Sequence, residues 1–386
     1  MPWPCLNTAI SRTRPILGCF GIGLGLLLAT PAMALEIRVG LRQDTDAITV
    51  GSSTPAQLID GKGRVLGQIP ELQGFSATAV SGGVSLASKH AWQIALKPKE
   101  GGFVYVGDQW YRGQVKLVRS GGGLTVVNQL NMEDYLASVI GKEMYPTWPQ
   151  EALKAQAVAS RSYAMFQKQR PKYSLFDVAS TTASQVYVGI AGEANSTQDA
   201  VKATSGQVLT YQGKVIEAVF HSASGGHTEN SENVWTGTVP YLRGVPDFDQ
   251  TAPVYQWTLM LTAAQMRQRI PGIGDIVALT PVKTSVTGRV QLMKVKGNQG
   301  DRLMKGSDLR TALGLKSTLF SVKPDFGLVA ATAGTGKPVS FAIDGKGSGH
   351  GLGMSQWGAY GLAQQGKTYR DILTHYFQHT TLKTIY

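Results

Sequence analysis

Cysteine is nearly absent from this chain of 386 residues. Its two cysteines, Cys5 and Cys19, both lie in the first 34 residues, so the remainder contains none. Disulfides, a thiolate zinc site and a cysteine nucleophile are therefore excluded from residue 35 onward. Charged residues are also sparse, at 16%, while 42% of residues are hydrophobic. These shares are those of a globular protein, not of a disordered chain or a polytopic membrane protein.

Several familiar catalytic signatures are missing as well. The loop 221–228 lacks the Gly-x-Ser-x-Gly elbow of serine hydrolases, and residues 353–358 miss that motif by one position. The Gly-rich loop 345–353 matches neither the P-loop nor the dinucleotide-binding fingerprint. Its glycines would let a bulky ligand approach the backbone closely, and the alternative is a plain hairpin-like loop. His375 and His379 have the i,i+4 spacing of a zincin without its Glu, so we expect both on the surface.

The first 34 residues have the pattern of a secretory signal. Arg12 and Arg14 supply the positive start, residues 15–35 carry no charge, and Ala32 and Ala34 form a small-x-small cleavage site. We expect cleavage before Leu35 and export across the cytoplasmic membrane, to the periplasm or cell wall. The alternative is an uncleaved anchor, because 21 uncharged residues could just span a bilayer. Membrane contact is expected only in that case.

Basic residues outnumber acidic ones, by 37 to 25 in the whole chain and by 35 to 25 after residue 34. A basic surface of this kind suits an anionic polymer. Outside the cytoplasm nucleic acid is a poor candidate for that polymer and a cell-wall polymer is a good one. We therefore expect no nucleic-acid partner.

The pattern of hydrophobic residues predicts an α+β fold. Residues 35–124 form a β-rich N-terminal region, with glycines between short β-forming segments. From Asn131, an expected N-cap, the apolar residues recur at helical spacing, which predicts a first helix. A second helix follows Pro146, is capped by Thr147 and Gln150, and ends near Gln169. Residues 125–386 form the second domain, a helical core followed by further strands at 207–211 and 215–220. An α/β segment is inserted at about 250–340, with a strand pair around Gly288 and a helix near 307–313. The Gly-rich loop closes a cleft, and a last helical region begins at Ser355.

Glu143 is a candidate general acid. It continues the apolar stripe of the first helix, eleven residues after Met132 and four after Val139. It also falls at the helix C-terminus, where the dipole disfavours a negative charge. Both effects would raise its pKa, as a general acid requires. The plainer alternative is a solvated Glu143 at a frayed helix end beside Lys142.

Other candidate residues allow a structural and a functional interpretation. Arg161 lies on a helical stripe and must be paired, either with Asp177 as a structural pair or with a ligand. His221 and His227 share a tight loop but lack an evident third metal ligand, so we expect no bound metal and no cofactor. Four tryptophans could either be buried in the core or provide surfaces on which sugars stack: Trp148, Trp235, Trp257 and Trp357.

Three segments together resemble the SpoIID/LytB family of cell-wall proteins. The first runs from Met132-Glu133-Asp134-Tyr135-Leu136 through Gly141-Lys142-Glu143-Met144 to Ser160-Arg161-Ser162-Tyr163-Ala164. The second is Phe220-His221-Ser222 with Ser224-Gly225-Gly226-His227-Thr228, and the third is Gly349-His350-Gly351-Leu352-Gly353-Met354-Ser355-Gln356-Trp357-Gly358-Ala359. Their order is that of the family, and the resemblance spans most of residues 125–375.

The resemblance implies a protein directed at peptidoglycan. Sporulation members are lytic transglycosylases, which leave a 1,6-anhydro-muramyl end, and LytB members are described as amidase enhancers. The family's catalytic acid falls on Glu143, and one carboxyl suffices for this chemistry, whereas ordinary glycosidases need a pair. The remaining motif positions are expected to bind substrate: Arg161, Tyr163, His221, Ser222, Ser224, Gly225, Gly226, His227, His350, Gly351, Met354, Ser355 and Gln356. Some members bind zinc through a Cys in the second motif. Because that position is Ser224 here, a structural zinc is not expected.

The sequence thus supports cleavage of peptidoglycan glycan strands by a lytic transglycosylase. Two alternatives stay open. One is a non-catalytic activator of a cell-wall amidase, which would bind glycan in the same cleft without cutting it. The other is a plain wall-binding module.

Overall fold

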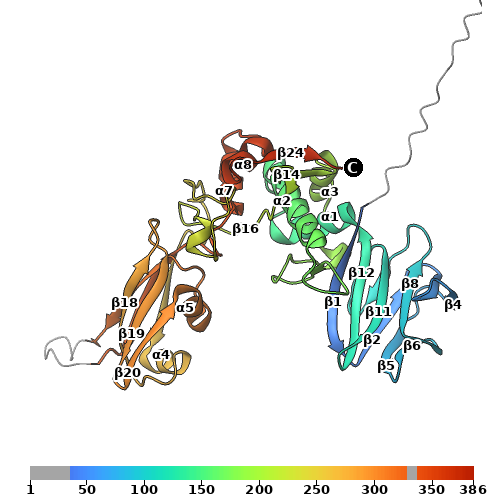
Figure 1. Ribbon diagram of the computed structural model, residues 1–386, viewed down its shortest axis with the longest axis horizontal. Coiled ribbons are helices and arrows are strands. Elements are labelled where there is room, and N and C mark those ends of the chain that lie inside the picture. The colour runs from blue at the N-terminus through green and yellow to red at the C-terminus, as the bar shows by residue number, and fades with distance from the viewer. Residues whose placement is uncertain (1–34, 328–336) are drawn as a thin grey trace, which may run out of the picture. The chain divides into compact units, whose positions relative to one another are not determined.

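The computed structural model describes residues 35–327 and 337–386, so the expected signal segment and both cysteines lie outside the described residues. Strands and helices are mixed along the chain, which confirms the α+β class (Figure 1). Within the described ranges, no helix has the length and apolar character needed to cross a membrane.

Two antiparallel sheets occupy most of the chain before residue 132, as the alternating β-forming segments predict. The first has the order β13–β1–β12–β11–β8–β3–β4, and the second has the order β10–β9–β2–β5–β6–β7. β13 (Val178–Ala179) comes from after the helices and adds to β1 in parallel. The other strands are β1 (Glu36–Thr45), β2 (Ala47–Ser52), β3 (Ala56–Asp60), β4 (Val65–Ile69), β5 (Phe75–Val80), β6 (Gly83–Leu86), β7 (Lys89–Ala91), β8 (Gln93–Pro98), β9 (Val104–Val106), β10 (Gln109–Tyr111), β11 (Gln114–Ser120) and β12 (Gly123–Asn131).

Helix α1 (Met132–Glu143) begins where the period changes in the sequence. The Asn131 side chain accepts a hydrogen bond from the Glu133 amide, which confirms it as the N-cap. The apolar stripe of this helix is buried, and Gly141 lets α1 approach the short 3₁₀ segment η1 (Gly189–Gly192) closely. A β-carbon at Gly141 would come within 2.0 Å of the Gly192 carbonyl oxygen.

Helix α2 (Gln150–Gln169) ends at the predicted residue but starts differently. Pro149 is its N-cap and makes no side-chain cap, so the predicted capping box of Thr147 and Gln150 is wrong. Thr147 lies two residues before the N-cap position, and the side-chain amide of Gln150 instead donates to the carbonyl oxygen of Ser196. Alanines along α2 are buried and let it pack tightly against α1 and α3 (Asn195–Ala203).

The C-terminal elements return to these helices. β14 (Gln207–Tyr211) pairs with β15 (Lys214–Val215) and with β24 (Thr381–Thr384) near the C-terminus. β16 (Phe220–His221) pairs in parallel with β23 (Met354–Ser355), and this pairing joins two loops far apart in sequence. Helix α7 (Gln356–Gln364) begins one residue after the predicted Ser355, which is its N-cap, and α8 (Tyr369–Tyr376) follows. A further 3₁₀ segment is η2 (Ser231–Asn233).

Residues 256–346 have a hydrophobic core of their own, with Phe341, Ile343, Val295 and Leu309 at its centre. The main core instead joins the N-terminal sheets to α1, α2, α7 and α8. Two three-stranded sheets, β17–β22–β21 and β18–β19–β20, surround the second core. The strand pair around Gly288 and the helix near 307–313 are both confirmed, and the elements are β17 (Gln256–Thr262), α4 (Ala263–Arg269), β18 (Ile276–Thr284), β19 (Val290–Gly297), β20 (Gly300–Lys305), α5 (Gly306–Leu313), β21 (Phe320–Asp325) and β22 (Ser340–Lys346).

Candidate functional site

Glu143 is the last residue of α1 and is half-buried. One carboxylate oxygen accepts a hydrogen bond from the Val186 amide at 3.0 Å, and the other accepts one from the Gln356 side-chain amide at 3.4 Å. Burial nevertheless dominates and raises the pKa of Glu143 above its ordinary value, although the two hydrogen bonds oppose the shift. The carboxyl is therefore held in place and favours its protonated form.

Two hollows, of about 320 and 330 Å³, meet at Glu143. Glu143, Ser222 and Gln356 line both of them. Aromatic and backbone groups add to the first: Gly141, Lys142, Met144, Tyr145, Pro146, Trp148 and Trp357. Helix α2, strand β16 and the loops beside them add polar and apolar groups to the second: Tyr163, Thr182, Ala183, Ser184, Val219, Phe220, His221 and His350. A chain-like ligand that ran from one hollow to the other would pass the Glu143 carboxyl.

The wall of the first hollow is aromatic. The rings of Trp148 and Trp357 meet edge to face with centroids 4.8 Å apart, and Tyr145 lies 5.4 Å from Trp148. Tyr145 is 60% exposed, so its ring is open to a ligand. Of the four tryptophans proposed as sugar-stacking surfaces, two thus come together beside Glu143. Aromatic walls with a few placed polar groups are typical of ligand sites.

His221 and His350 form a neutral pair in the second hollow. The Leu352 amide donates to His350 Nδ1, and His350 Nε2 donates to the Phe220 carbonyl oxygen, both at 3.0 Å. His221 Nδ1 donates to the Leu352 carbonyl oxygen at 3.0 Å, which leaves its Nε2 as a lone-pair acceptor. Among the described residues, no group forms a hydrogen bond with this buried Nε2. Burial is the largest cause that lowers both pKa values, to about 4 for His350 and well below its usual range for His221.

The loop that follows His221 is fixed by two buried carboxylates. The Ser224 hydroxyl donates to Asp247 at 2.5 Å, and the Gly225 amide donates to Asp249 at 2.7 Å. Tyr376 donates to the other oxygen of Asp247 at 2.5 Å. Burial, together with the neighbouring Asp247, raises the pKa of Asp249. Ser224 and Gly225 therefore hold this loop in place through Asp247 and Asp249. The sequence did not identify these two Asp residues.

The Gly-rich loop has a support of its own. Arg289 is 2% exposed, donates to the Ser224 carbonyl oxygen at 2.6 Å and lies against Gly351. A β-carbon on Gly351, whose φ is +84°, would come within 2.6 Å of the Arg289 guanidinium carbon, so glycine is required there. Met354 and Ser355 are buried in β23, and Gly226 packs against Tyr255. These motif residues shape the loops that carry His350 and Gln356.

Arg161 does not reach either hollow. It is fully buried on α2, and its guanidinium makes two bonds to Glu133, at 2.9 and 2.5 Å. The pairing with Asp177 proposed from the sequence is wrong, because Asp177 instead pairs with Arg38 at 2.6 Å. Sequence proximity favoured Asp177, whereas the packing of α1 on α2 brings Glu133 to Arg161.

His227 also lies outside both hollows, with Nδ1 2.7 Å from the carbonyl oxygen of Thr228. The zinc considered from the sequence would need this histidine beside His221 and a thiolate where Ser224 stands. Because Ser224 is bonded to Asp247 and His227 points elsewhere, these residues do not fit a zinc ion. In the described part of the chain, no three His, Cys, Asp or Glu side chains lie together as a metal site.

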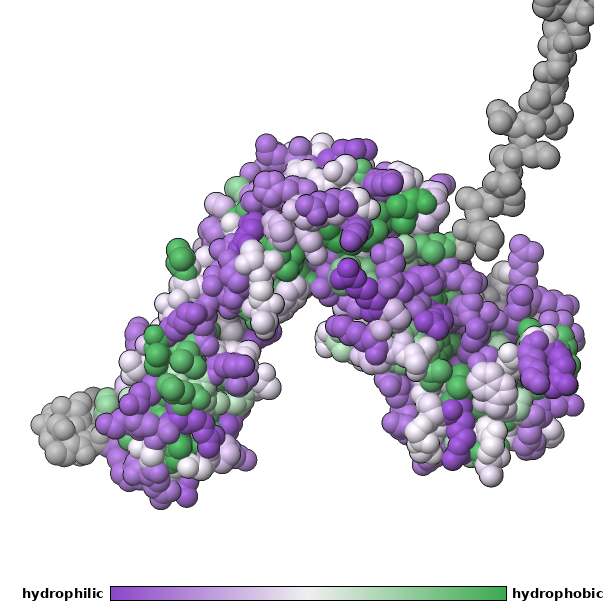
Figure 2. All heavy atoms as spheres, viewed as in Figure 1, coloured by the Kyte–Doolittle hydropathy of each residue, from purple (hydrophilic) through white to green (hydrophobic). Residues whose placement is uncertain are grey.

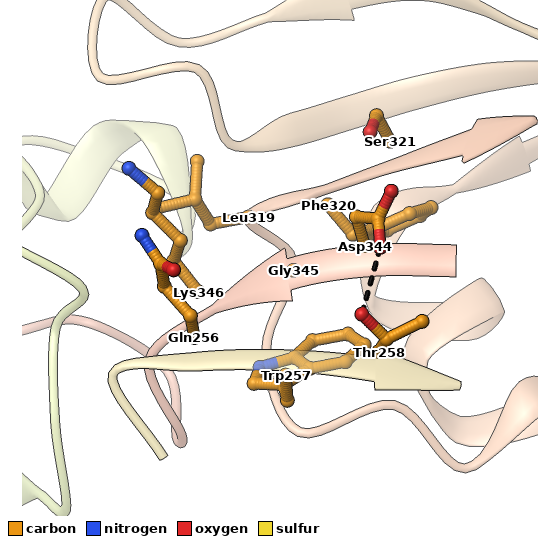
Figure 3. A pocket seen from close by; sticks show the side chains of 9 residues that line it. All are labelled: Gln256, Trp257, Thr258, Leu319, Phe320, Ser321, Asp344, Gly345 and Lys346. Atoms are coloured by element: carbon orange, nitrogen blue, oxygen red, sulfur yellow. Dashed lines mark hydrogen bonds between the residues drawn. The ribbon is translucent and has the colours of Figure 1, made fainter. Parts of the chain in front are cut away.

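A larger hollow, of about 480 Å³, lies on the sheet β17–β22–β21, and of the candidate residues it contains only Trp257 (Figure 3). Figure 3 shows Thr258 donating to Asp344, at 2.8 Å, on this sheet. The Trp257 ring packs over Gly345 and its indole nitrogen donates to the Gly347 carbonyl oxygen at 2.8 Å. Trp257 therefore has a structural role, which leaves the hollows at Glu143 as the candidate active site.

The raised pKa of Glu143 predicts a pH-dependent loss of stability. Below the usual range of a glutamate, the carboxyl is protonated in both the folded and the unfolded chain. Protonated Glu143 is easier to bury than its carboxylate, so the folded state is most stable in this range. As the pH rises through the raised pKa of the folded state, Glu143 ionises and this stability is lost. We expect the free energy of unfolding of the wild type to fall relative to that of Glu143→Gln over a pH range that begins at about 4 and ends above the raised pKa of Glu143. Urea denaturation of both proteins across this range measures it, and parallel curves would contradict the shift.

Two family models match the chain. One, described as Stage II sporulation protein, matches residues 120–211, which include α1, α2 and Glu143. The other, described as Domain of unknown function (DUF8618), matches residues 241–353, which include the second core and the whole Gly-rich loop.

Curated relatives match over most of the chain. An uncharacterised protein of Brachyspira hyodysenteriae is 37% identical over 288 residues, 72% of this chain and 73% of the relative. Stage II sporulation protein D of Bacillus subtilis is 34% identical over 281 residues, 66% of this chain and 75% of the relative. The amidase enhancer of Bacillus subtilis is 33% identical over 302 residues, 64% of this chain and 40% of the relative.

Proposed function

The chain belongs to the SpoIID/LytB family, which acts in the cell wall, and from that premise we propose that it cleaves peptidoglycan glycan strands as a lytic transglycosylase. One observation carries the proposal. Among the residues that the structure describes, Glu143 is the only carboxylate that lines either hollow of the candidate site. Ordinary glycoside hydrolysis requires two carboxyl groups that face the scissile bond. A single carboxyl fits a reaction in which the sugar supplies its own nucleophile.

The proposed reaction begins with a protonated Glu143, which its burial favours. The proton passes from Glu143 to the glycosidic oxygen as the bond from that oxygen to the anomeric carbon breaks. The 6-hydroxyl of the same sugar then bonds to the anomeric carbon and gives its proton to the Glu143 carboxylate. The products are a free 4-hydroxyl and a 1,6-anhydro end, no water is consumed, and Glu143 is again protonated.

The surrounding residues position the substrate in this proposal. The aromatic wall of Tyr145, Trp148 and Trp357 faces the sugar on one side of the scissile bond. On the other side, the half-buried Ser222, which lines both hollows, hydrogen-bonds to a sugar hydroxyl. The amides of Val186 and Gln356 hold the carboxylate between the two reaction stages.

A non-catalytic amidase activator is the second candidate, favoured by the relative named an amidase enhancer. Both candidates use the same hollows to bind glycan, so binding does not separate them. Purified glycan strands and intact wall are incubated with the protein, with a muramoyl-alanine amidase, and with both. The proposal expects new glycan ends with the protein alone. Release of stem peptides only when both are present, without new glycan ends, would assign it as an activator.

We propose that the protein acts outside the cytoplasmic membrane and begins at Leu35 after processing. Signal peptidase needs small side chains at the positions of Ala32 and Ala34. The expected result of N-terminal sequencing of the exported protein is a single start at Leu35. An intact N-terminus recovered in the membrane fraction would show the uncleaved anchor instead.

A further inference from the structure

Most of the net positive charge after residue 34 lies in one quarter of the chain. Residues 256–346 contain 13 lysines and arginines and 5 acidic residues, a net charge of +8. The rest of the chain from residue 35 onward contributes only +2. A glycan-binding cleft does not explain this concentration, because neither hollow at Glu143 is lined by a residue of this segment.

Four lysines of this segment gather on one face of the sheet β18–β19–β20. The register places Lys283, Leu292 and Lys305 in one row across the three strands. The next row is Thr280, Lys294 and Leu303, and the third is Ala278, Lys296 and Asp301. Side chains of residues paired across a sheet share a face. We call this set the lysine face: Lys283, Lys294, Lys296 and Lys305 with Leu292 and Leu303 between them.

The lysine face is directed to solvent. Met293 and Val295, which alternate with its residues along β19, are buried in the second core on the opposite side. All four lysines are exposed, and Lys294 is paired with Asp301 at 2.9 Å. Leu303 is 61% exposed in their midst. Figure 2 shows hydrophobic side chains among hydrophilic ones over this part of the molecule.

We propose that the lysine face is a docking surface for a membrane of anionic lipids. The ammonium groups would lie at the level of the lipid phosphates, and the protruding leucine would enter the boundary with the acyl chains. A soluble polyanion would also attract the lysines but would leave Leu303 in water. The hollows described above involve none of these six residues, so the face offers a plane and not a cleft. This contact is independent of an uncleaved signal segment, to which the sequence alone had confined membrane binding.

Vesicle binding of residues 35–386 tests the proposal, because this part contains both hydrophobic cores and excludes the signal segment. The probes are vesicles of phosphatidylglycerol and vesicles of phosphatidylcholine, followed by co-sedimentation. We expect binding to the first only, and release at high salt because the Debye length shrinks. Each lysine near an anionic surface is worth about fivefold in partitioning, so exchange of all four for Gln should weaken binding by about 10²–10³-fold. Leu303→Ser should weaken it by about tenfold through lost apolar contact.

The matched control exchanges four exposed lysines of the N-terminal sheets, Lys62, Lys89, Lys97 and Lys99, for Gln, with the same change in net charge. This variant should keep nearly all vesicle binding if the lysine face is the docking surface. Equal losses in both quadruple variants would reduce the effect to net charge and overturn the proposal. Binding to soluble polyphosphate that Leu303→Ser leaves unchanged, without binding to vesicles, would assign the face to a polyanion instead. Circular dichroism confirms that each variant is folded.

Discussion

Glycan cleavage by Glu143→Gln should fall by about 10²–10⁴-fold, the usual contribution of a positioned general acid. The amide preserves the size of the side chain and can still meet Gln356, but it has no proton to give to the glycosidic oxygen. The fold should hold, because a neutral amide is easier to bury than a carboxylate. Initial rates of glycan cleavage, with wall binding measured alongside, check this result.

The control is Glu71→Gln, which changes an exposed carboxylate away from both hollows and should cleave at the wild-type rate. Wall binding should survive in both variants, since the aromatic wall and Ser222 are unchanged. A Glu143→Gln protein that cleaves normally would remove Glu143 from the mechanism. A wild-type protein without any cleavage would favour the amidase activator.

Glu133→Ala should destabilise the main core by about 3–5 kcal/mol, the usual cost of removing one partner from a buried ion pair. Arg161 has no exposed surface, so the loss of Glu133 leaves a guanidinium in the core with only the carbonyl oxygens of Gln207, Ala157 and Val201. Glu133 also accepts hydrogen bonds from Tyr386 and from the Gly206 amide, so it joins α1 to the C-terminal end of the chain. Urea denaturation measures the change in the free energy of unfolding.

Two further variants make this prediction specific. The double change Glu133→Leu with Arg161→Met removes both charges and should recover most of the lost stability. Asp301→Ala breaks the exposed pair with Lys294 and should cost less than about 1 kcal/mol. If Glu133→Ala costs no more than Asp301→Ala, the buried pair does not stabilise the core, and a substrate role for Arg161 would have to be reconsidered.

Local sequence patterns predicted the elements that carry the site. The change of period at Asn131 marked α1, the alanine run marked α2, and Ser355 marked the start of α7. Each of these signals depends on neighbours within a few residues, which is why they could be identified from sequence alone. The position of Glu143 at the end of the stripe followed from the same period.

Contacts between distant segments could not be predicted in this way. The partner of Arg161 depends on how α1 packs against α2, and sequence proximity pointed to Asp177 instead. The amide of Val186 that holds Glu143 lies in an irregular loop without a motif. Asp247 and Asp249, which fix Ser224, have no signature at their own positions. The lysine face arises from strand register, because its lysines are spread over 23 positions of the sequence.

The origin of the oxygen at the new glycan end shows whether the sugar's own hydroxyl or water attacks the anomeric carbon. Purified glycan strands are cleaved in water enriched in oxygen-18, and the new ends are analysed by mass spectrometry. We expect anhydro-muramyl ends, lighter by one water than a reducing end and free of oxygen-18, because the 6-hydroxyl and not water attacks the anomeric carbon. Reducing ends that contain oxygen-18 would show a hydrolase with a second catalytic group and would contradict the single-carboxyl mechanism of Glu143.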